Sequence, residues 1–184
     1  MNYHLKVAGL ERELPLCKVA DDFYIAAFIM FGDVEITVNS ARELLKKAPE
    51  FDVLITAESK GIPLLYEMAK QAGKNYYIVA RKGPKLYMRD VIHTKVDSIT
   101  TDHQQILCIG AEEAQAMRGK RVLVVDDVIS TGESLAALET LINQVGGNIV
   151  GKMAVLAEGD AIGRTDITYL APLPVFHADG SEIK

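Results

Sequence analysis

The sequence predicts an α/β protein built around a parallel sheet, and three observations lead to that prediction. Residues 122–125 form an aliphatic run without a polar group, which is typical of a strand buried on both faces in the middle of a parallel sheet. An amphipathic helix pattern follows at 132–145. A second aliphatic run at 51–56 is followed by a helix that starts near Pro63. Strands that alternate with helices in this way indicate an α/β fold.

The length and charge of the chain limit the classes of protein to which it can belong. A chain of 184 residues fits one domain and can bury about 70% of its unfolded surface. We therefore expect residues 1–184 to form a single domain with its core at 50–156. The 20 Lys and Arg residues face 25 Asp and Glu residues, which gives a net charge of −5. This acidic balance argues against nucleic-acid binding, although it permits a local anion site.

The cysteines, histidines and apolar runs predict the compartment. Cys17 and Cys108 lack the spacing of a zinc or redox motif and lie among apolar residues, which predicts buried, reduced thiols. The histidines have no metal-ligand spacing. No apolar run approaches the ~20 residues that cross a bilayer, and the first residues do not resemble an export signal. We expect a cytoplasmic protein without membrane contact and without a metal held directly by its side chains.

The remaining elements follow from periodicity and capping signals. Ser40, with Glu43 three residues later, fits the N-cap of a helix over 41–48. Residues 91–109 alternate around a polar turn at 100–103, which predicts a β-hairpin, and the tail from Ala171 is expected to be irregular. In chain order, strands are predicted at 5–7, 14–19, 51–56, 75–80, 122–125, 148–156 and 167–170, and helices at 63–72, 111–117 and 132–145.

Chemically distinctive residues begin where the central strand is predicted to end. Asp126 and Asp127 follow that strand, and Ser130, Thr131 and Gly132 open the next helix. Open α/β sheets bind ligands at the carboxyl ends of their strands, and unpaired N–H groups at a helix start suit a phosphate. Two carboxylates beside a phosphate suit the vicinal hydroxyls of a sugar. The stretch therefore predicts a site for a ribose 5-phosphate.

Two other interpretations of the acidic pair are weaker. A response-regulator receiver also has acids at a strand end, but near the start of a domain of roughly 100–150 residues. Here only residues 128–184 follow the pair. Alternatively, the two acids merely end a strand in a surface turn. The coincidence of acids, hydroxyls and a glycine in one strand-to-helix loop favours a binding site.

Two further loops combine cations with glycine. Glu58-Ser59-Lys60-Gly61 follows the strand at 51–56; Gly61 lets the backbone bend toward a ligand, and Lys60 can face an anion. In a chain that is acidic overall, the stretch 81–95 is locally basic, which favours an anion site over a solvated surface. Its cations are Arg81, Lys82, Lys85, Arg89 and Lys95.

Together these motifs resemble the type I phosphoribosyltransferases. Residues 122–134, Val-Leu-Val-Val-Asp-Asp-Val-Ile-Ser-Thr-Gly-Glu-Ser, look like the family's motif for PRPP (5-phosphoribosyl 1-diphosphate). The loop 58–61 resembles the Glu-Ser-Arg-Gly loop of adenine phosphoribosyltransferases, with Lys in place of Arg. Residues 81–85 resemble the Arg-Lys-x-x-Lys segment of adenine and orotate enzymes. The three loops occur in the family's order within residues 50–156.

The resemblance implies a doubly wound parallel sheet with a small N-terminal hood, at residues 1–36, that closes over a nucleobase. Asp126 and Asp127 would have the catalytic roles. The implied ribose 5-phosphate contacts are Asp126, Asp127, Val128, Ile129, Ser130, Thr131, Gly132, Glu133 and Ser134, and the implied diphosphate contacts are Ser59, Lys60, Gly61, Arg81, Lys82 and Lys85. The hood's candidates for stacking on the base are Phe23, Tyr24, Phe28 and Phe31.

The implied reaction transfers ribose 5-phosphate from PRPP to a nucleobase, giving a nucleoside 5′-monophosphate and diphosphate in purine salvage. Mg²⁺ would be bound mainly through PRPP, and a homodimer is common in the family. Adenine is the first choice of base. Xanthine, hypoxanthine-guanine and orotate enzymes, and a non-catalytic PRPP-sensing regulator, stay open as alternatives.

Three positions depart from the family's patterns. Glu133 stands where the family usually has Gly or another small residue, and Ser130 stands where the hypoxanthine-guanine type often has an acid. In the family, the region equivalent to 91–109 is a mobile loop that closes over the site. Here it lacks the Glu-Tyr-Gly-Thr-Asp-like signature of the adenine enzymes. The sequence therefore assigns no catalytic acid.

Overall fold

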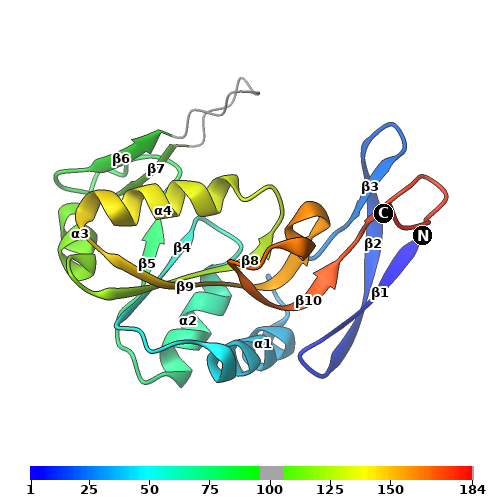
Figure 1. Ribbon diagram of the computed structural model, residues 1–184, viewed down its shortest axis with the longest axis horizontal. Helices are drawn as coiled ribbons and strands as arrows, with labels where there is room; N and C mark the ends of the chain where they lie inside the picture. Colours follow the sequence, from blue (N-terminus) through cyan, green and yellow to red (C-terminus); the bar gives the residue numbers. More distant parts are fainter. Residues whose placement is uncertain (96–105, 184) are drawn as a thin grey trace.

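The computed structural model describes residues 1–95 and 106–183, and its centre is a five-stranded parallel sheet (Figure 1). The strand order is β10-β9-β8-β4-β5, and each neighbouring pair is parallel. The strands are β4 (Val53–Ala57), β5 (Ile78–Ala80), β8 (Arg121–Ile129), β9 (Asn148–Glu158) and β10 (Thr168–Leu173). The aliphatic run at 122–125 thus lies in the central strand, as predicted.

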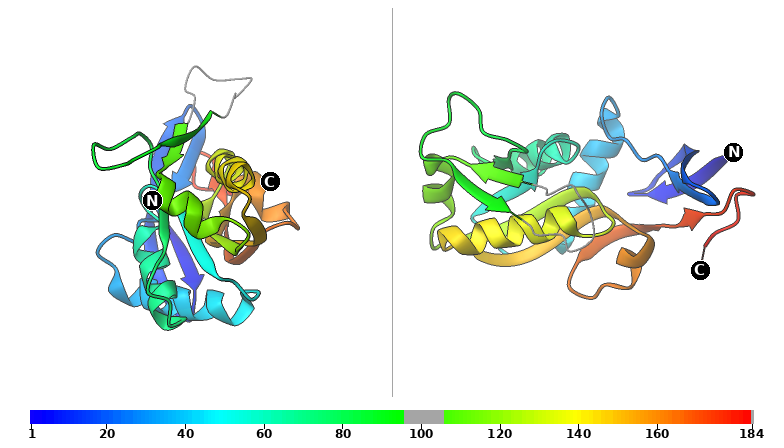
Figure 2. Two further views of the ribbon diagram at one scale, coloured as in Figure 1. Left: turned by 90° about the vertical axis from the view of Figure 1, so that its left-hand side faces the viewer. Right: turned by 90° about the horizontal axis from the view of Figure 1, so that it is seen from above.

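Helices cover both faces of this sheet. Helices α1 (Val34–Lys47) and α2 (Ile62–Gln71) lie on one face, and α3 (Ala111–Met117) and α4 (Glu133–Val145) lie on the other (Figures 1 and 2). Alternate side chains of β8 pack into the two layers, because Leu123 and Val125 belong to one buried cluster and Val122 and Val124 to the other. The predicted doubly wound sheet is therefore confirmed.

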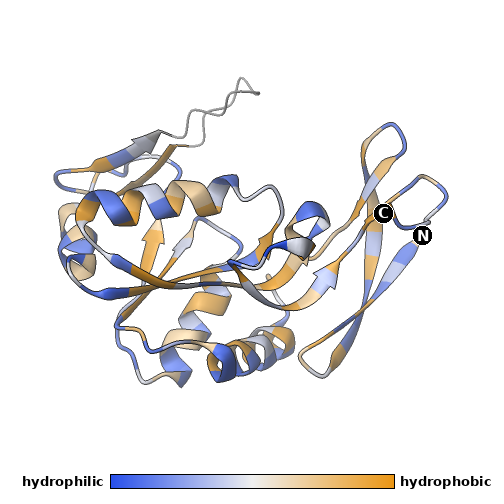
Figure 3. Ribbon diagram, viewed as in Figure 1, coloured by the Kyte–Doolittle hydropathy of each residue, from blue (hydrophilic) through white to orange (hydrophobic). Residues whose placement is uncertain are grey.

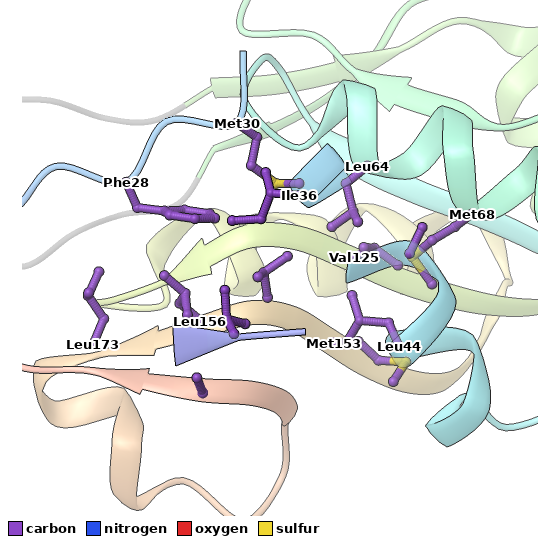
Figure 4. Packing of buried hydrophobic residues seen from close by; sticks show 14 of the residues in the cluster. Phe28, Met30, Ile36, Leu44, Leu64, Met68, Val125, Met153, Leu156 and Leu173 are labelled. Atoms are coloured by element: carbon purple, nitrogen blue, oxygen red, sulfur yellow. The ribbon is translucent and has the colours of Figure 1, made fainter. Parts of the chain in front are cut away.

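The first buried cluster joins the parallel sheet to the rest of the molecule. Leu44 of α1 and Met68 of α2 pack with Val125 and Met153 of the sheet (Figure 4). The same cluster includes Leu5, which is far from β10 in the sequence but packs in the same core. Figure 3 shows that β5 and the middle of β9 in the parallel sheet are mainly hydrophobic, whereas α4 alternates between hydrophobic and hydrophilic residues. Burial between layers accounts for this pattern.

A second, antiparallel sheet brings together the first and the last named strands of the chain. Its order is β1-β2-β3-β11, with β1 at Asn2–Val7, β2 at Leu10–Ala20, β3 at Phe23–Ala26 and β11 at Val175–Phe176. The two N-terminal strands predicted at 5–7 and 14–19 exist, but both are longer. We call this element the antiparallel sheet.

The prediction of an irregular tail is wrong. Strand β10 continues through Pro172 to Leu173, and Val175 pairs with Ile25 of β3. Proline is tolerated at 172 because β10 is the edge strand of the parallel sheet. The tail therefore carries the chain directly from the parallel sheet into the antiparallel sheet.

The predicted start of the first helix is also wrong. Helix α1 begins at Val34, and its N-cap is Asp33, whose Oδ1 accepts the backbone N–H of Ile36 at 3.0 Å. Arg12 of β2 holds Asp33 in place, with Nε donating to Oδ2 at 2.7 Å. Ser40 lies buried within the helix and does not cap it. Asp is a common N-cap residue, so a local signal for this start existed, but Ser40 with Glu43 fits a capping box equally well.

The smaller elements complete the fold. Strands β6 (Ile92–Lys95) and β7 (Ile106–Ile109) pair antiparallel, as the predicted hairpin requires, while its turn at 100–103 lies outside the described residues. The short helix η1 spans Gly159–Gly163. Cys108 is buried as expected, but Cys17 is exposed, contrary to expectation. None of the helices in the described residues combines the length and the apolar character that crossing a membrane requires.

Candidate ribose 5-phosphate site

The acidic pair lies inside β8 rather than after it. The expectation that the strand ends before Asp126 is wrong, because β8 stays paired with β9 as far as Ile129. Successive side chains of a strand point to opposite faces, so the two acids have different surroundings: Asp127 is 2% exposed, whereas Asp126 is half-buried. The Oδ1 atom of Asp126 accepts the backbone N–H of Asp127 at 2.9 Å.

The carboxyl groups of this pair are poorly satisfied. Among the described residues, Oδ2 of Asp127 is buried without a hydrogen-bond partner, and the ammonium group of Lys60 lies 3.6 Å from it. Burial raises the pKa of Asp126 well above its ordinary value, and the negative charge of Asp127 raises it further. Desolvated carboxyl groups with so few donors are costly to the free protein. They are ready to accept hydrogen bonds from a ligand.

A small cavity lies over the end of β8 and the start of α4. Its volume is about 130 Å³. The side of the cavity nearest the strand includes Asp126, and its floor is the turn that leads into the helix. The lining residues are Asp126, Val128, Ile129, Ser130, Thr131, Gly132, Glu133, Ser134 and Leu135. All the sequence-predicted ribose 5-phosphate contacts except Asp127 thus meet in one cavity.

The turn at Gly132 presents the helix start to this cavity. Gly132 is the N-cap of α4 and has a φ of +82°, a backbone conformation that favours glycine. Glycine has no side chain to cap the helix, and the backbone N–H of Glu133 donates to Oγ1 of Thr131 at 3.5 Å. A helix start of this kind suits an anion. Glu133 lines the same cavity and stands in the first helical turn. Its carboxylate there interacts favourably with the helix dipole.

Arg164 packs against the same turn, and the sequence analysis did not identify it. A β-carbon at position 132 would stand 2.5 Å from Nη1 of Arg164. The guanidinium group is fixed by Asp166, with Nε donating to Oδ1 at 2.9 Å and Nη2 to Oδ2 at 2.7 Å. Asp166 also accepts from Lys152 of β9, which pairs with Glu139 of α4 at 2.6 Å. These linked ion pairs hold the guanidinium group of Arg164 against the turn.

The loop after β4 brings Lys60 and Gly61 to the acidic pair. A β-carbon at Gly61 would collide with Oγ1 of Thr56 and stand 3.1 Å from Oδ1 of Asp126. Position 61 must therefore be glycine for the loop to lie this close to β8. The peptide bond between Glu58 and Ser59 is cis. Ser59 and Lys60 are exposed at the surface of this loop.

Glu58 links this loop to the basic loop that follows β5. Its Oε2 accepts the backbone N–H of Lys82 at 3.1 Å, and its Oε1 lies 3.3 Å from Nη2 of Arg81. The backbone of Arg81 is held in turn by Cys108 of β7, through two hydrogen bonds of 2.8 Å. The charge of Lys85 acts on the same Cys108, whose pKa is raised mainly by burial. The predicted diphosphate contacts therefore form two connected loops.

A larger cavity is lined both by the turn at 130–131 and by residues of the antiparallel sheet. Its volume is about 450 Å³. The walls from the antiparallel sheet and the tail are largely apolar, and the opposite wall is polar, with Ser130, Thr131, Glu158 and Asp160. The apolar lining residues are Val19, Phe23, Ile25, Val175 and Ile183. Because Ser130 and Thr131 line both cavities, the two spaces adjoin each other.

The four aromatic candidates for base stacking are not equivalent. Phe23 lines the larger cavity. Phe28 is 5% exposed and belongs to the core (Figure 4), and Tyr24 packs against the same core. Phe31 is exposed and is not among the residues that line this cavity. Phe23 is therefore the candidate that the structure favours.

The sequence analysis missed Glu158 and Asp160, which both lie at this second cavity. The sequence offered one weak signal for them. An acid that follows a buried strand lies at the same edge of the sheet as Asp126. The strand was predicted to end at Leu156, which left both acids in an unassigned loop.

A doubly wound parallel sheet with a strand-to-helix turn after an acidic pair in its central strand is the architecture expected of the type I phosphoribosyltransferases. The chain matches the family model described as phosphoribosyl transferase domain over residues 35–171. It therefore belongs to the phosphoribosyl transferase family.

Individual relatives agree with this assignment. The chain is 34% identical over 114 residues to the adenine phosphoribosyltransferase of Cenarchaeum symbiosum, which covers 61% of this chain and 64% of the relative. It is 30% identical over 133 residues to that of Natranaerobius thermophilus, which covers 72% of this chain and 73% of the relative. The chain thus spans slightly less than two thirds of the first of these relatives.

The fold also has a close parallel among solved structures. The crystal structure of the adenine phosphoribosyltransferase from Thermoanaerobacter pseudethanolicus superposes with a TM-score of 0.64 at 21% identity, and the match covers 78% of this chain and 84% of that chain. The predicted type I phosphoribosyltransferase fold is confirmed.

Proposed function

We propose that this protein transfers ribose 5-phosphate from PRPP to a purine, with adenine as the first choice, in purine salvage. The observation that carries the proposal is the pair of adjoining cavities. One lies between Asp126 and the start of α4, and the other lies under the antiparallel sheet and shares Ser130 and Thr131 with the first. A sugar phosphate in the first cavity would hold its C1 atom toward a base in the second.

Each part of PRPP has a matching group. The 5′-phosphate would accept hydrogen bonds from the N–H groups at the start of α4. The ribose hydroxyls would donate to Asp126 and Asp127, which supports their assignment as catalytic groups. The diphosphate would lie against Ser59, Lys60 and Gly61, with Arg81, Lys82 and Lys85 supplying further positive charge. This assignment uses the buried Oδ2 of Asp127, which lacks a donor among the described residues.

The reaction would consist of one displacement at C1 of the ribose. A ring nitrogen of the base forms a bond to C1, the bond from C1 to the diphosphate oxygen breaks with its electron pair going to the diphosphate, and the N–H proton of the base passes to water. Positive charge develops on the ribose and negative charge on the diphosphate, so catalysis would be positional and electrostatic. Asp126 and Asp127 lie beside the developing cation, and Lys60 beside the departing anion.

Magnesium would accompany PRPP. Among residues 1–95 and 106–183, no three acidic, histidine or cysteine side chains gather into a metal site. Mg²⁺ usually keeps several waters and binds through substrate phosphates with few protein ligands, so PRPP itself would supply most of the ligands of the ion. When bound, the ion would neutralise charge on the diphosphate.

We also infer a cytoplasmic homodimer. Both cysteines are unpaired, which fits a reducing compartment. A groove between α1 and α2 is surrounded by exposed apolar side chains: Val34 is 74% exposed and Tyr66 is 53% exposed. Apolar patches of this kind mark interaction surfaces. Light scattering of wild type and Val34→Asp tests this point, because the substitution should convert a dimer to a monomer; a wild-type monomer would contradict it.

The test of the proposed function is diphosphate release from PRPP and Mg²⁺ with adenine, hypoxanthine, guanine, xanthine and orotate in turn. We expect release that depends on a base and is fastest with adenine. Fastest release with another base would replace adenine with that base. PRPP binding without release in the presence of any base would favour a PRPP-sensing regulator instead.

A further inference from the structure

Glu158 occupies a position that connects the two cavities. It is the last residue of β9 and follows Ala157, whose register partner in β8 is Ile129. Glu158 therefore lies level with Ser130 at the carboxyl end of the sheet, and the two residues line the larger cavity together. A carboxyl group at this point faces the space beside the sugar-phosphate turn.

The carboxyl group of Glu158 lacks a partner within the part of the chain that the structure describes. Among the described residues, no hydrogen bond or ion pair reaches it, and the charges that act on it are those of Lys60 and Asp127. Burial raises the pKa of Glu158, the charge of Asp127 raises it further, and Lys60 opposes both effects. A half-buried carboxyl group that lacks donors carries a desolvation cost. A ligand with N–H groups would relieve that cost.

The other walls of the cavity leave little else to recognise a base. Val19, Phe23 and Ile25 supply apolar area and one aromatic ring, which bind any planar base with little discrimination. Discrimination must come from the polar wall, whose charged members are the acids Glu158 and Asp160, with no Lys or Arg among the lining residues. Such a wall accepts hydrogen bonds. It suits a base that presents an amino group and disfavours one that presents a carbonyl oxygen or a negative charge.

We propose that Glu158 is a specificity-determining residue that accepts a hydrogen bond from an N–H group of the nucleobase and so selects an aminopurine over an oxopurine. The proposal rests on the proposed function and adds the residue that chooses among its candidate bases. Adenine carries an amino group where hypoxanthine carries a carbonyl oxygen. Orotate carries a carboxylate, which would lie beside the two acids Glu158 and Asp160 and is therefore disfavoured.

The test compares wild type with Glu158→Gln, which keeps the size of the side chain and adds an N–H donor. The measured quantity is the ratio of kcat/KM for adenine to kcat/KM for hypoxanthine. We expect this ratio to fall at least about tenfold, because the variant loses a charged acceptor for the amino group and gains a donor for the carbonyl oxygen. The KM for PRPP should stay within about twofold of wild type. If Glu158 had only a structural role, the variant would lower kcat/KM for adenine and kcat/KM for hypoxanthine equally.

Glu112→Gln is the matched control, since Glu112 is an exposed carboxylate on α3 outside both cavities. It should leave the ratio unchanged. An unchanged ratio in Glu158→Gln, or a loss confined to the KM for PRPP or to the Mg²⁺ requirement, would overturn the proposal. If the Gln variant does not fold, Glu158→Asp must lower the same ratio, because the shorter side chain withdraws the acceptor.

Calorimetry separates this proposal from the proposed function. If wild type releases no diphosphate with any base, the proposed function fails. The binding of free adenine and hypoxanthine to wild type and to Glu158→Gln, measured in the presence of ribose 5-phosphate, then still tests Glu158. A preference for adenine that disappears in the variant supports the assignment, and equal binding of both bases to wild type contradicts it.

Discussion

The two ends of the parallel sheet carry the same kinds of charged residue in opposite arrangements. At the amino ends of β4 and β8, Asp52 and Arg121 pair closely: Nη2 of Arg121 donates to Oδ1 of Asp52 at 2.9 Å, and its backbone N–H donates to Oδ2 at 2.9 Å. Glu50 adds a second carboxylate at 2.6 Å. At the carboxyl end, Asp127 has Lys60 at 3.6 Å and no hydrogen bond to its Oδ2 from any described residue.

The pKa shifts at the two ends have opposite signs for physical reasons. The hydrogen bonds from Arg121 lower the pKa of Asp52 far below its ordinary range. Burial and the adjacent Asp127 raise the pKa of Asp126. Pairing that satisfies a carboxylate stabilises the fold, whereas an unsatisfied pair costs stability and leaves acceptors available to a ligand. The contrast indicates which end of the sheet is built for binding.

The largest effect is expected when the unsatisfied acids are neutralised. Asp126→Asn with Asp127→Asn should lower kcat/KM for PRPP at least about 100-fold, because two charged acceptors for the ribose hydroxyls are lost. Steady-state kinetics measures this loss, and circular dichroism checks that the double variant stays folded. The matched control is Asp52→Asn with Glu50→Gln at the opposite end of the sheet, which should retain wild-type kinetics. Wild-type turnover in the Asp126→Asn, Asp127→Asn variant would show that these two acids have no role in the reaction.

An intermediate effect is expected for Lys60, the cation that lies 3.6 Å from Asp127 at the carboxyl end. Lys60 is 53% exposed and lies near Asp127, so Lys60→Gln should mainly weaken binding of the diphosphate. We expect its inhibition constant to rise about tenfold, the effect of one charge-assisted hydrogen bond. Lys70→Gln on α2 is the control, since Lys70 is similarly exposed and pairs with Glu67. Equal inhibition constants in wild type and Lys60→Gln would exclude Lys60 from the diphosphate site.

A smaller effect on stability follows from the pKa of Asp126. Because this pKa is raised in the folded protein, the folded state binds more protons than the unfolded state above the ordinary Asp range, and stability falls as the pH rises through that window. Asp126→Asn removes the penalty. Its Tm should exceed that of wild type by about 2–4 °C at pH 8, and the gain should disappear near pH 4. A gain that grows toward low pH would show that the sign is wrong.

The smallest effect is expected at the paired end of the sheet. The pKa of Asp52 is lowered, so its contribution to stability is present above the ordinary Asp range and is lost as the pH falls through the folded-state pKa. Asp52→Asn should therefore lower the Tm slightly at pH 7 and not at all at strongly acidic pH. Because the pair is exposed to water, salt should reduce the difference further. A decrease in Tm for Asp52→Asn that is larger than the Tm change for Asp126→Asn would contradict the comparison of the two ends of the sheet.

The sequence predicted the parts of the fold that local patterns determine. Residues 122–125 have no polar group, and helix α2 has Pro63 in its first turn, so the central strand and the strand–loop–helix unit were both found. The start of α1 was missed because Ser40 with Glu43 also fits a capping box, whereas the N-cap is Asp33. The tail was missed because Pro172 argues against a strand unless the strand is known to be at an edge.

Motifs in the sequence predicted which loops make up the candidate site, but they did not predict its three-dimensional details. The turn at 130–134 and the loop at 58–61 meet at Asp126, as their order along the chain suggested. The different burial of Asp126 and Asp127 depends on how far β8 stays paired with β9, which the sequence does not reveal. Arg164 reaches the turn from a distant part of the chain, through a contact that has no local signature. Glu158 was missed because the strand before it was predicted to end at Leu156, whereas β9 continues to Glu158.

The most direct test of the central claim is a calorimetric titration with ribose 5-phosphate and with 2-deoxyribose 5-phosphate. If the acids hold the sugar hydroxyls while the turn holds the phosphate, wild type should bind the deoxy sugar at least about tenfold more weakly, and the Asp126→Asn, Asp127→Asn variant should bind both sugars equally. Equal affinity of wild type for the two sugars would contradict the account.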